Sequence, residues 1–308
     1  MENLVILENS ANFNPRDIDE IQLSIGWTEQ KYIDAAPLWS HYDMFRNCDY
    51  FATAKIGEKT VGVLEAFADR DNFATSYLSI IMVHKDYQKK GVGRALMNAF
   101  NKKFAHTTTW AITPITQSRD GVAFLEKFGF NETPNFTTCW RKRGIDPLSY
   151  EITKKPKKEL PQGLVILENS ANFNPRDIDE IQLSVGWTEQ KYIDAAPLWS
   201  HYDMFRNFDY VATAKIGEKT VGVLDAFSDR DNAFTSRLYG IMVHKEYQRK
   251  GIGTALMDAF NKKFAHTTTW AITPIGKNKD GVPFLEKFGF NQNTENFTVC
   301  WRKRKKGE

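Results

Sequence analysis

The sequence is poor in cysteine, in long apolar runs and in excess charge of either sign. Its 308 residues include only three cysteines, Cys48, Cys139 and Cys300. This odd, sparse set makes neither a disulfide framework nor metal-ligand spacing. No stretch approaches the roughly 20 apolar residues that a membrane span requires, and residues 1–10 do not resemble a signal peptide. The net charge of +3 gives no electrostatic case for nucleic acid. We therefore expect a cytoplasmic protein with no metal, membrane or nucleic-acid partner.

What the sequence does contain is a long internal repeat. The string LVILENSANFNPRDIDEIQLS occupies Leu4–Ser24 and again Leu164–Ser184, at an offset of 160 residues. The offset holds as far as Gly129–Asn131 and Gly289–Asn291, after which one residue is inserted in the second copy. Solenoid repeats take roughly 20–50 residues, so this repeat is a duplicated domain.

The duplication predicts two domains and a linker. We expect one domain over residues 1–143, a linker over 144–163 and a second domain over 164–308. Proline, glycine and lysine are frequent between Gly144 and Gly163, as is typical of a linker. An additional strand within Leu148–Thr153 is the alternative. The two domains could also pair within the chain as a pseudo-dimer.

One copy contains signals for alternating strands and helices. Strands are expected at Leu4–Glu8, Tyr50–Ile56, Thr60–Phe67, Tyr77–Val83, Thr107–Ile115 and Phe136–Arg141, and helices from Pro15 to about Gly26, from Glu29, over Val92–Phe104 and over Gly121–Phe128. This order predicts an α/β fold, in which a mixed, mostly antiparallel, twisted sheet is flanked by helices and contains one strand–helix–strand crossover.

The motif that indicates chemistry follows the strand that ends at Val83. It reads VHKDYQKKGVGRAL from Val83 to Leu96, and VHKEYQRKGIGTAL from Val243 to Leu256. A strand thus leads through a glycine-containing loop into a helix whose first amides have no intrahelical acceptor. Such a helix start binds anions and suits a pyrophosphate.

Two common phosphate motifs do not fit this loop. A P-loop requires G-x-x-x-x-G-K-[ST], which is absent. A dinucleotide fingerprint requires a third glycine, where this sequence has Leu96 and Leu256. The loop instead resembles the Q-x-x-G-x-G loop of the GNAT acetyltransferase superfamily. Ser24–Trp27 and Ser184–Trp187 are similar to the small "SVGW" branch of that family, and the resemblance covers nearly all of each copy.

The resemblance implies that each copy binds acetyl-CoA as co-substrate. The cofactor-binding residues it implies are Ile81, Met82, Val83, Gln88, Lys89, Lys90, Gly91, Val92, Gly93 and Arg94, and in the second copy Ile241, Met242, Val243, Gln248, Arg249, Lys250, Gly251, Ile252, Gly253 and Thr254. Backbone amides of Ile81–Val83 and Ile241–Val243 would donate to the thioester carbonyl. The sequence departs from the family at Leu125 and Leu285, where many members have a tyrosine that protonates the leaving thiolate.

The catalytic base is expected to be Glu65, with Asp225 as its counterpart. Each is a carboxylate in an otherwise apolar strand, which favours a raised pKa; a position on the solvent face is the alternative. Asp69, Asp71, Asp229 and Asp231 could attract a cationic amine or could cap loops. Cys48, replaced by Phe208 in the second copy, is expected to be a packing residue, as is Trp27.

The acceptor side differs between the copies. Tyr77, Ser79 and Ile80 correspond to Arg237, Tyr239 and Gly240, so the two acceptor preferences could differ. The leading hypothesis is an N-acetyltransferase acting on the primary amine of a small molecule. The alternatives are acetylation of a protein lysine or N-terminus, and a coenzyme A-binding sensor or interaction module with weak catalysis.

Overall fold

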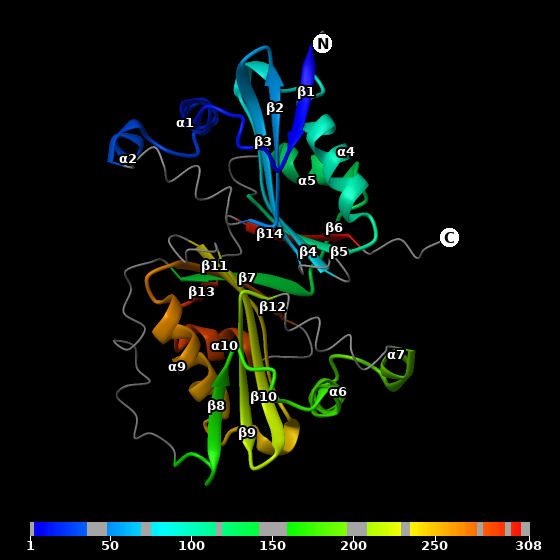
Figure 1. Cartoon of the computed structure of the whole chain (residues 1–308), viewed down its shortest axis with the longest axis vertical. Helices are drawn as coiled ribbons and strands as arrows, with labels where there is room; N and C mark the ends of the chain where they lie inside the picture. The colour runs from blue at the N-terminus through cyan, green and yellow to red at the C-terminus, as the bar shows by residue number, and fades with distance from the viewer. Residues whose placement is uncertain are drawn as a thin grey trace. The chain divides into compact units, whose positions relative to one another are not determined.

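The computed structural model describes residues 3–35, 48–68, 75–114, 119–141, 159–195, 208–228, 235–275, 280–292 and 297–302. The chain forms two compact units, one of Met1–Thr133 with Asn296–Glu308 and one of Pro134–Glu295. Each unit contains a seven-stranded mixed sheet with helices on both faces (Figure 1). The expected α/β fold is therefore confirmed. No helix in these ranges is long and apolar enough to cross a membrane.

The two copies have the same order of elements. The first contains β1 (Leu4–Glu8), α1 (Pro15–Ser24), α2 (Gln30–Ala35), β2 (Tyr50–Ile56), β3 (Lys59–Ala68), β4 (Thr75–Val83), α4 (Val92–Phe104), β5 (Thr108–Pro114), α5 (Arg119–Glu126), β6 (Asn131–Glu132) and β7 (Phe136–Arg141). The second contains β8 (Leu164–Glu168), α6 (Pro175–Ser184), α7 (Gln190–Ala195), β9 (Tyr210–Ile216), β10 (Lys219–Ser228), β11 (Thr235–Val243), α9 (Ile252–Phe264), β12 (Thr268–Pro274), α10 (Gly281–Glu286), β13 (Asn291–Gln292) and β14 (Phe297–Arg302).

Most expected elements form within a residue or two of their predicted ends. Helix α1 stops at Ser24, slightly before the expected Gly26, because Gly26 has φ +70° and turns the chain. The Trp27 amide then donates to the Gln22 carbonyl at 2.9 Å, which closes the helix end. A short 3₁₀ turn at Lys85–Tyr87 and the two-residue strand β6 were not expected. The alternative strand within Leu148–Thr153 lies outside the described residues.

Each sheet is antiparallel except at one pair of strands. In the first unit the order is β1-β2-β3-β4-β5-β14-β6, and β4 pairs with β5 in parallel. Helix α4 makes the crossover between these two strands, because a parallel pair requires a connection that returns the chain to the same end. The second unit has the equivalent parallel pair, β11 and β12, with α9 between them.

The core of each unit lies between the sheet and its long helix. Leu96, Phe100 and Phe104 of α4 are fully buried against Leu64 and Ala66 of β3. Helix and sheet approach closely at Gly62, where an added Cβ would lie 3.0 Å from Val92 Cγ1. The start of α4 is therefore fixed relative to the sheet.

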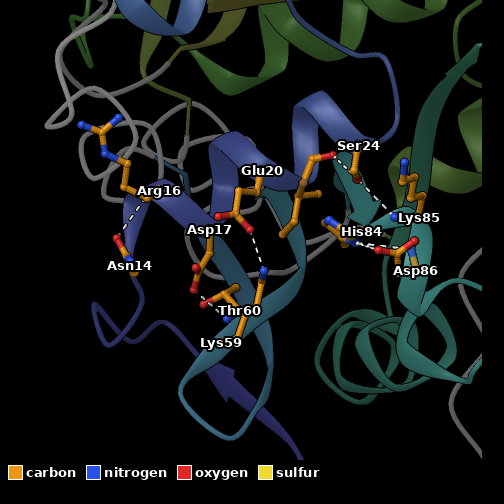
Figure 2. Close-up of polar contacts among 11 residues, drawn as sticks. Asn14, Arg16, Asp17, Glu20, Ser24, Lys59, Thr60, His84, Lys85 and Asp86 are labelled. Carbon is orange, nitrogen blue, oxygen red and sulfur yellow. Dashed lines mark hydrogen bonds and ion pairs between the residues drawn. The ribbon is translucent and has the colours of Figure 1, made fainter. Parts of the chain in front are cut away.

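Helix α1 is attached to the start of β3 by polar contacts (Figure 2). Its Asp17 carboxylate accepts from the Thr60 amide at 2.7 Å, and Glu20 forms an ion pair with Lys59 at 2.6 Å. The second unit repeats both contacts, between Asp177 and Thr220 and between Glu180 and Lys219. Helices α1 and α4 flank the sheet in Figure 1, so the face that does not carry α4 carries α1.

The last strand of each copy pairs in the sheet of the other copy. Strand β14 pairs with β5 and β6 in the first sheet, and β7 pairs with β12 and β13 in the second. Both strands form where the sequence predicts a strand, but each is exchanged. The sheets are consequently not built from two consecutive stretches of chain.

An arginine secures each exchanged strand. Arg302 of β14 donates to Asn101 of α4 and to Thr109 Oγ1 at 3.1 Å, and its guanidinium lies 4.9 Å from the Phe130 ring centroid. Arg141 of β7 is fully buried and contacts Asn261 and Phe290 in the same way. Burial lowers the pKa of Arg302 to about 10, so the guanidinium remains charged at neutral pH. Each strand therefore carries its own polar anchor into the other copy's sheet.

The exchange predicts that the two halves stay together after cleavage of the linker. A protease site inserted between residues 144 and 158 should be cut without separating the fragments, because each fragment supplies a mostly buried strand to the other's sheet. Size-exclusion chromatography of the cut protein should give the apparent mass of the whole chain in native buffer, whereas in denaturant the fragments should elute at about half that mass. Elution at about half the mass in native buffer would show that the exchange does not hold the halves.

Candidate functional site

The central feature of each unit is the divergence of its two parallel strands. Strands β4 and β5 pair only from Thr75 to Leu78, although β4 continues to Val83. Beyond that point β4 keeps its pairing with β3, from Ile80 to Val83, and β5 pairs with β14. Among the described residues, no strand therefore lies beside one backbone edge of the second half of β4. The second unit diverges at the equivalent residue, Leu238.

The loop after β4 is held by side chains on both sides (Figure 2). The Lys85 amide donates to Ser24 Oγ of α1 at 3.1 Å, and the Asp86 amide donates to His84 Nδ1 at 3.3 Å. The Gln88 side-chain amide donates to the Val83 carbonyl at 3.0 Å. The same contacts occur in the second copy through Ser184, His244 and Gln248. The loop is thus fixed by the helix before the sheet and by its own glutamine.

Helix α4 begins at a glycine in the left-handed region. Gly91 has φ +89° and Gly251 has φ +83°, a conformation that glycine adopts without steric cost. Neither helix start has a side-chain cap, and the first helical bond runs from the Ala95 amide to the Gly91 carbonyl. The amides of residues 91–94 precede that bond, so they have no acceptor within the helix. An anion placed there would meet these amides and the positive end of the helix dipole.

The expected cofactor residues divide into two groups by burial. Met82 and Val92 are buried, and Ile81 and Val83 pack against the core, so these residues can offer only their backbone. Lys89, Lys90, Gly91 and Arg94 are exposed around the start of α4. In the second copy Arg249 forms an ion pair with Asp280 at 2.6 Å, whereas Lys250 lies over the Tyr247 ring as Lys90 lies over that of Tyr87. The structure brings both groups together at one end of β4.

The second loop has one neighbour that the first lacks. A Cβ on Gly251 would lie 2.9 Å from Leu160 Cδ2, whereas one on Gly91 would meet nothing within 4 Å among the described atoms. Leu160 is itself 52% exposed. The two loops share their backbone geometry but not their surroundings.

The two expected base residues lie on β3 and β10, opposite the diverging strand. Glu65 and Asp225 are 4% and 2% exposed, which excludes a position on the solvent face. Glu65 pairs with Ile80 of β4, and the register shifts at the next residue, which makes a bulge at Ser79. Asp225 pairs with Gly240 and has the same bulge after it. The carboxylates therefore stand beside the point where β4 leaves β5.

Burial changes the protonation of Asp225. It raises the pKa of the Asp225 carboxyl to about 8, and the nearby backbone amides of Gly240 and Asp225 only partly oppose the rise. No hydrogen-bond partner for Asp225 Oδ1 occurs in the described part of the chain. A carboxyl with this pKa changes charge close to neutral pH, which suits a general base.

Cys48 is a packing residue, as the sequence indicated. It is buried, and burial together with the charge of the nearby Glu65 raises the pKa of its thiol well above the usual range. A protonated thiol is a poor nucleophile. The Glu65 carboxylate is therefore close enough to Cys48 to affect the pKa of its thiol.

Trp27 does not pack in the core, contrary to expectation. Its side chain is 48% exposed, because the turn at Gly26 directs the chain away from α1. Asp69, Asp71, Asp229 and Asp231 lie outside the described residues. Leu125 and Leu285 are core residues, each 4% exposed. The role of Ser24 was missed, since a serine at the end of a helix gives no signal that it holds a distant loop.

Comparison with known proteins identifies the family. Residues 176–290 match the model of the "Acetyltransferase (GNAT) family", and residues 30–154 match that of an "Acetyltransferase (GNAT) domain". The chain thus belongs to the GNAT acetyltransferases, a family that generally uses acetyl-CoA. Within that family it is a tandem protein, with one family domain matched in each half.

Individual relatives agree with this assignment. An "Uncharacterized N-acetyltransferase ycf52" of Porphyra purpurea is 24% identical over 126 residues, which are 41% of this chain and 70% of the relative. A GCN5-related N-acetyltransferase from Sphaerobacter thermophilus has TM-score 0.58 at 12% identity, covering 100% of this chain and 98% of its own. A tandem GNAT protein from the clavulanic acid biosynthesis pathway has TM-score 0.54 at 14% identity, covering 99% of both chains. At these identities the structures show a shared fold.

Replacement of Asp225 should change the pH dependence of stability. The folded-state pKa of about 8 lies above the ordinary value of 3.8, so between pH 4 and 8 the folded protein holds a proton that the unfolded chain releases. Asp225→Asn stays neutral at every pH. Relative to this variant, the free energy of unfolding of the native chain should therefore fall by up to about 1.4 kcal/mol for each unit by which the pH rises within this window. Urea unfolding of both proteins at pH 5, 6, 7 and 8 measures the difference.

The control for this measurement is Glu218→Gln, at an exposed hairpin position. Its unfolding free energy should run parallel to that of the native chain. If Asp225→Asn also runs parallel from pH 5 to 8, Asp225 is ionised throughout and its pKa is not raised.

Proposed function

We propose that the chain is an acetyl-CoA-dependent N-acetyltransferase that acetylates the primary amine of a small molecule, with one active site in each copy. One observation carries the proposal. In both units a 13-residue helix opens at a left-handed glycine, directly after a strand that has parted from its neighbour. The family generally uses acetyl-CoA. In this geometry the amides at the start of the helix would bind the pyrophosphate of acetyl-CoA, and the edge of the strand would bind its acyl arm.

The residues around the helix start fit a pyrophosphate. Four consecutive residues, Gly91 to Arg94, precede Ala95, whose amide is the first donor within the helix, and an added Cβ on Gly91 would point into open space. Lys89 and Lys90 are exposed beside them. In this proposal the amides of residues 91–94 and 251–254 bind the phosphate oxygens, and Gln88 and Gln248 hold the loops in position through the Val83 and Val243 carbonyls.

The edge of β4 would then bind the thioester. Attack by an amine places negative charge on the carbonyl oxygen, which requires a hydrogen-bond donor. The open edge of β4 beyond Leu78 supplies backbone amides within Ile81–Val83 for this purpose, and β11 supplies those within Ile241–Val243. These amides belong to a paired strand, so they are already in place before the reaction.

Glu65 and Asp225 would remove the proton from the acceptor. An alkylamine of pKa about 10.4 is mostly protonated at neutral pH and cannot attack until it loses a proton. Each carboxylate lies beside the bulge of β4, directly across from residue 80 or 240. In this proposal it accepts the proton of the amine, either directly or through water.

A second candidate function rests on one observation. Leu125 and Leu285 fill the core where many family members place a catalytic tyrosine, so neither copy offers a phenol there to protonate the leaving thiolate. A coenzyme A-binding sensor with weak catalysis would need no such group. Release of free thiol with an amine panel separates the two functions, and turnover of peptides but of no small amine would indicate a protein acetyltransferase.

The expected cellular location is the cytoplasm. All three cysteines are free and buried, as is usual for proteins of a reducing compartment.

Loss of either loop should remove one of two acetyl-CoA sites. Gly91→Glu and Gly251→Glu place a side chain and a negative charge at the left-handed helix start, so each should lower the stoichiometry measured by equilibrium dialysis from two to one. The double variant should bind none. The matched controls are Gly57→Glu and Gly217→Glu, which carry the same left-handed strain in hairpin turns, with φ +59° at both, and should keep two sites.

Loss of either carboxylate should reduce the rate without loss of cofactor. Glu65→Gln in the Gly251→Glu background, and Asp225→Asn in the Gly91→Glu background, should lower kcat/KM for the amine by about 10²–10⁴-fold, because that is the usual worth of a general base. The dissociation constant for acetyl-CoA should stay within twofold. In the Gly91→Glu background the rate should rise with pH up to about 8, following Asp225. An unchanged rate in both variants would exclude these residues as bases.

A further inference from the structure

The two copies are identical over long stretches but differ around the buried carboxylate. The hairpin Ala52–Leu64 has the same sequence as Ala212–Leu224, as does Leu4–Ser24 with Leu164–Ser184. The substitutions near the carboxylate are Cys48/Phe208, Phe51/Val211, Glu65/Asp225, Tyr77/Arg237, Ser79/Tyr239 and Ile80/Gly240. Most of the differences between β2–β4 and β9–β11 thus lie close to this carboxylate.

These positions share one face of the sheet. Phe51 and Ile80 are the neighbours of Glu65 on the two flanking strands. The alternate residues Leu64, Ala66 and Leu78 belong to the core beneath α4. Since side chains alternate along a strand, Phe51, Glu65 and Ile80 lie on the face opposite α4. In the second copy the Tyr239 ring contacts those of Phe208 and Phe227, which places both substituted residues beside this face.

The first pair of changes, Glu65/Asp225 and Ile80/Gly240, alters the position of the carboxylate. A Cβ on Gly240 would lie 2.8 Å from Asp225 Oδ1, closer than real Cβ contacts come. A side chain at position 240 is therefore incompatible with Asp225 as it stands. In the first copy the longer Glu65 is accompanied by Ile80, which is partly exposed. The carboxylate and the residue opposite it have changed together.

The second pair of changes, Cys48/Phe208 and Ser79/Tyr239, produces an aromatic cluster in the C-terminal copy. The ring centroid of Phe208 lies 4.5 Å from that of Phe227 and 5.2 Å from that of Tyr239. Tyr239 is partly exposed, and it is the neighbour of Gly240 in β11. The first copy has the small side chains of Cys48 and Ser79 at these positions. Beside the carboxylate, the second copy thus has the Tyr239 ring and the backbone of Gly240, whereas the first copy has the aliphatic side chain of Ile80.

We propose that the two copies have different acceptor specificities, set by positions 48/208, 65/225, 79/239 and 80/240. The C-terminal copy takes amines with a planar aromatic body, which stacks on Tyr239 over the flat backbone of Gly240. The N-terminal copy takes amines with a compact aliphatic body, because Ile80 occupies the space that a ring would need. This inference rests on the proposed acetyltransferase function and assigns the substrate class of each site.

Single-site variants of the full chain test this directly. Gly251→Glu leaves the N-terminal site and Gly91→Glu leaves the C-terminal site, and each is assayed for thiol release with n-pentylamine and with 2-phenylethylamine. The ratio of kcat/KM for the aromatic amine to that for the aliphatic amine should be about tenfold higher in the C-terminal site. Equal ratios in two active sites would overturn the specificity proposal alone. No turnover of either amine at either site would overturn the proposed function, and this inference with it.

Exchange of the four residues tests which positions are responsible. Phe208→Cys, Asp225→Glu, Tyr239→Ser and Gly240→Ile together, in the Gly91→Glu background, should move the ratio toward that of the N-terminal site. The reciprocal exchange, Cys48→Phe, Glu65→Asp, Ser79→Tyr and Ile80→Gly in the Gly251→Glu background, should move it the other way, and it keeps the test available if the first variant does not fold. Ratios that stay unchanged in a folded variant that still binds acetyl-CoA would refute the assignment of these positions.

The coupling of positions 225 and 240 can be measured without turnover. Gly240→Ile alone should lower the unfolding temperature, because its Cβ meets the Asp225 carboxylate. Adding Asp225→Glu should recover part of the loss, since the first copy accommodates that combination. If the double variant is no more stable than Gly240→Ile, the two positions have not changed together for steric reasons.

Discussion

The parting of β4 from β5 after four paired residues is the constraint on which both fold and site depend. Because the strands separate at Leu78 and Ala111, the far half of β4 keeps an open edge and β5 requires another partner. Helix α4 starts at the end of that open half, and Gly62 brings the sheet against its first turn. The arrangement gathers strand amides, helix amides and the buried carboxylate at one end of β4, although they come from separate parts of the sequence.

The partner that β5 receives is the last strand of the other copy. Its main polar anchor is an arginine that contacts an asparagine of the long helix, Arg302 with Asn101 or Arg141 with Asn261. Such a buried guanidinium is tolerated because several acceptors and an aromatic ring surround it. The long helix that begins at the glycine loop therefore also contacts the exchanged strand, through an asparagine further along the helix. The candidate site and the strand exchange thus depend on the same helix.

Much of the fold could be predicted from the sequence, and the strand exchange could not. Periodicity and turn residues locate β1, β2 and α4 to the residue, and the glycine loop identifies the family because its residues are contiguous. The exchanged strands have the nearly identical sequences FTTCWR and FTVCWR. Their hydrophobic pattern therefore fits the sheet of either copy equally well. The closeness of Asp225 to Gly240 was also beyond the sequence, because a bulge shifts the register between β10 and β11.

The exchange also bears on how the duplicated halves can evolve. A mutation in the final strand of one repeat alters the sheet of the other, as with Thr138 and Val299, which occupy equivalent positions in opposite sheets. Loss of one repeat would leave the survivor with a strand that has no recipient and a sheet that lacks its donor. Residues on β3 and β10 can change within their own repeat, whereas each last strand must remain compatible with a partner strand encoded in the other repeat.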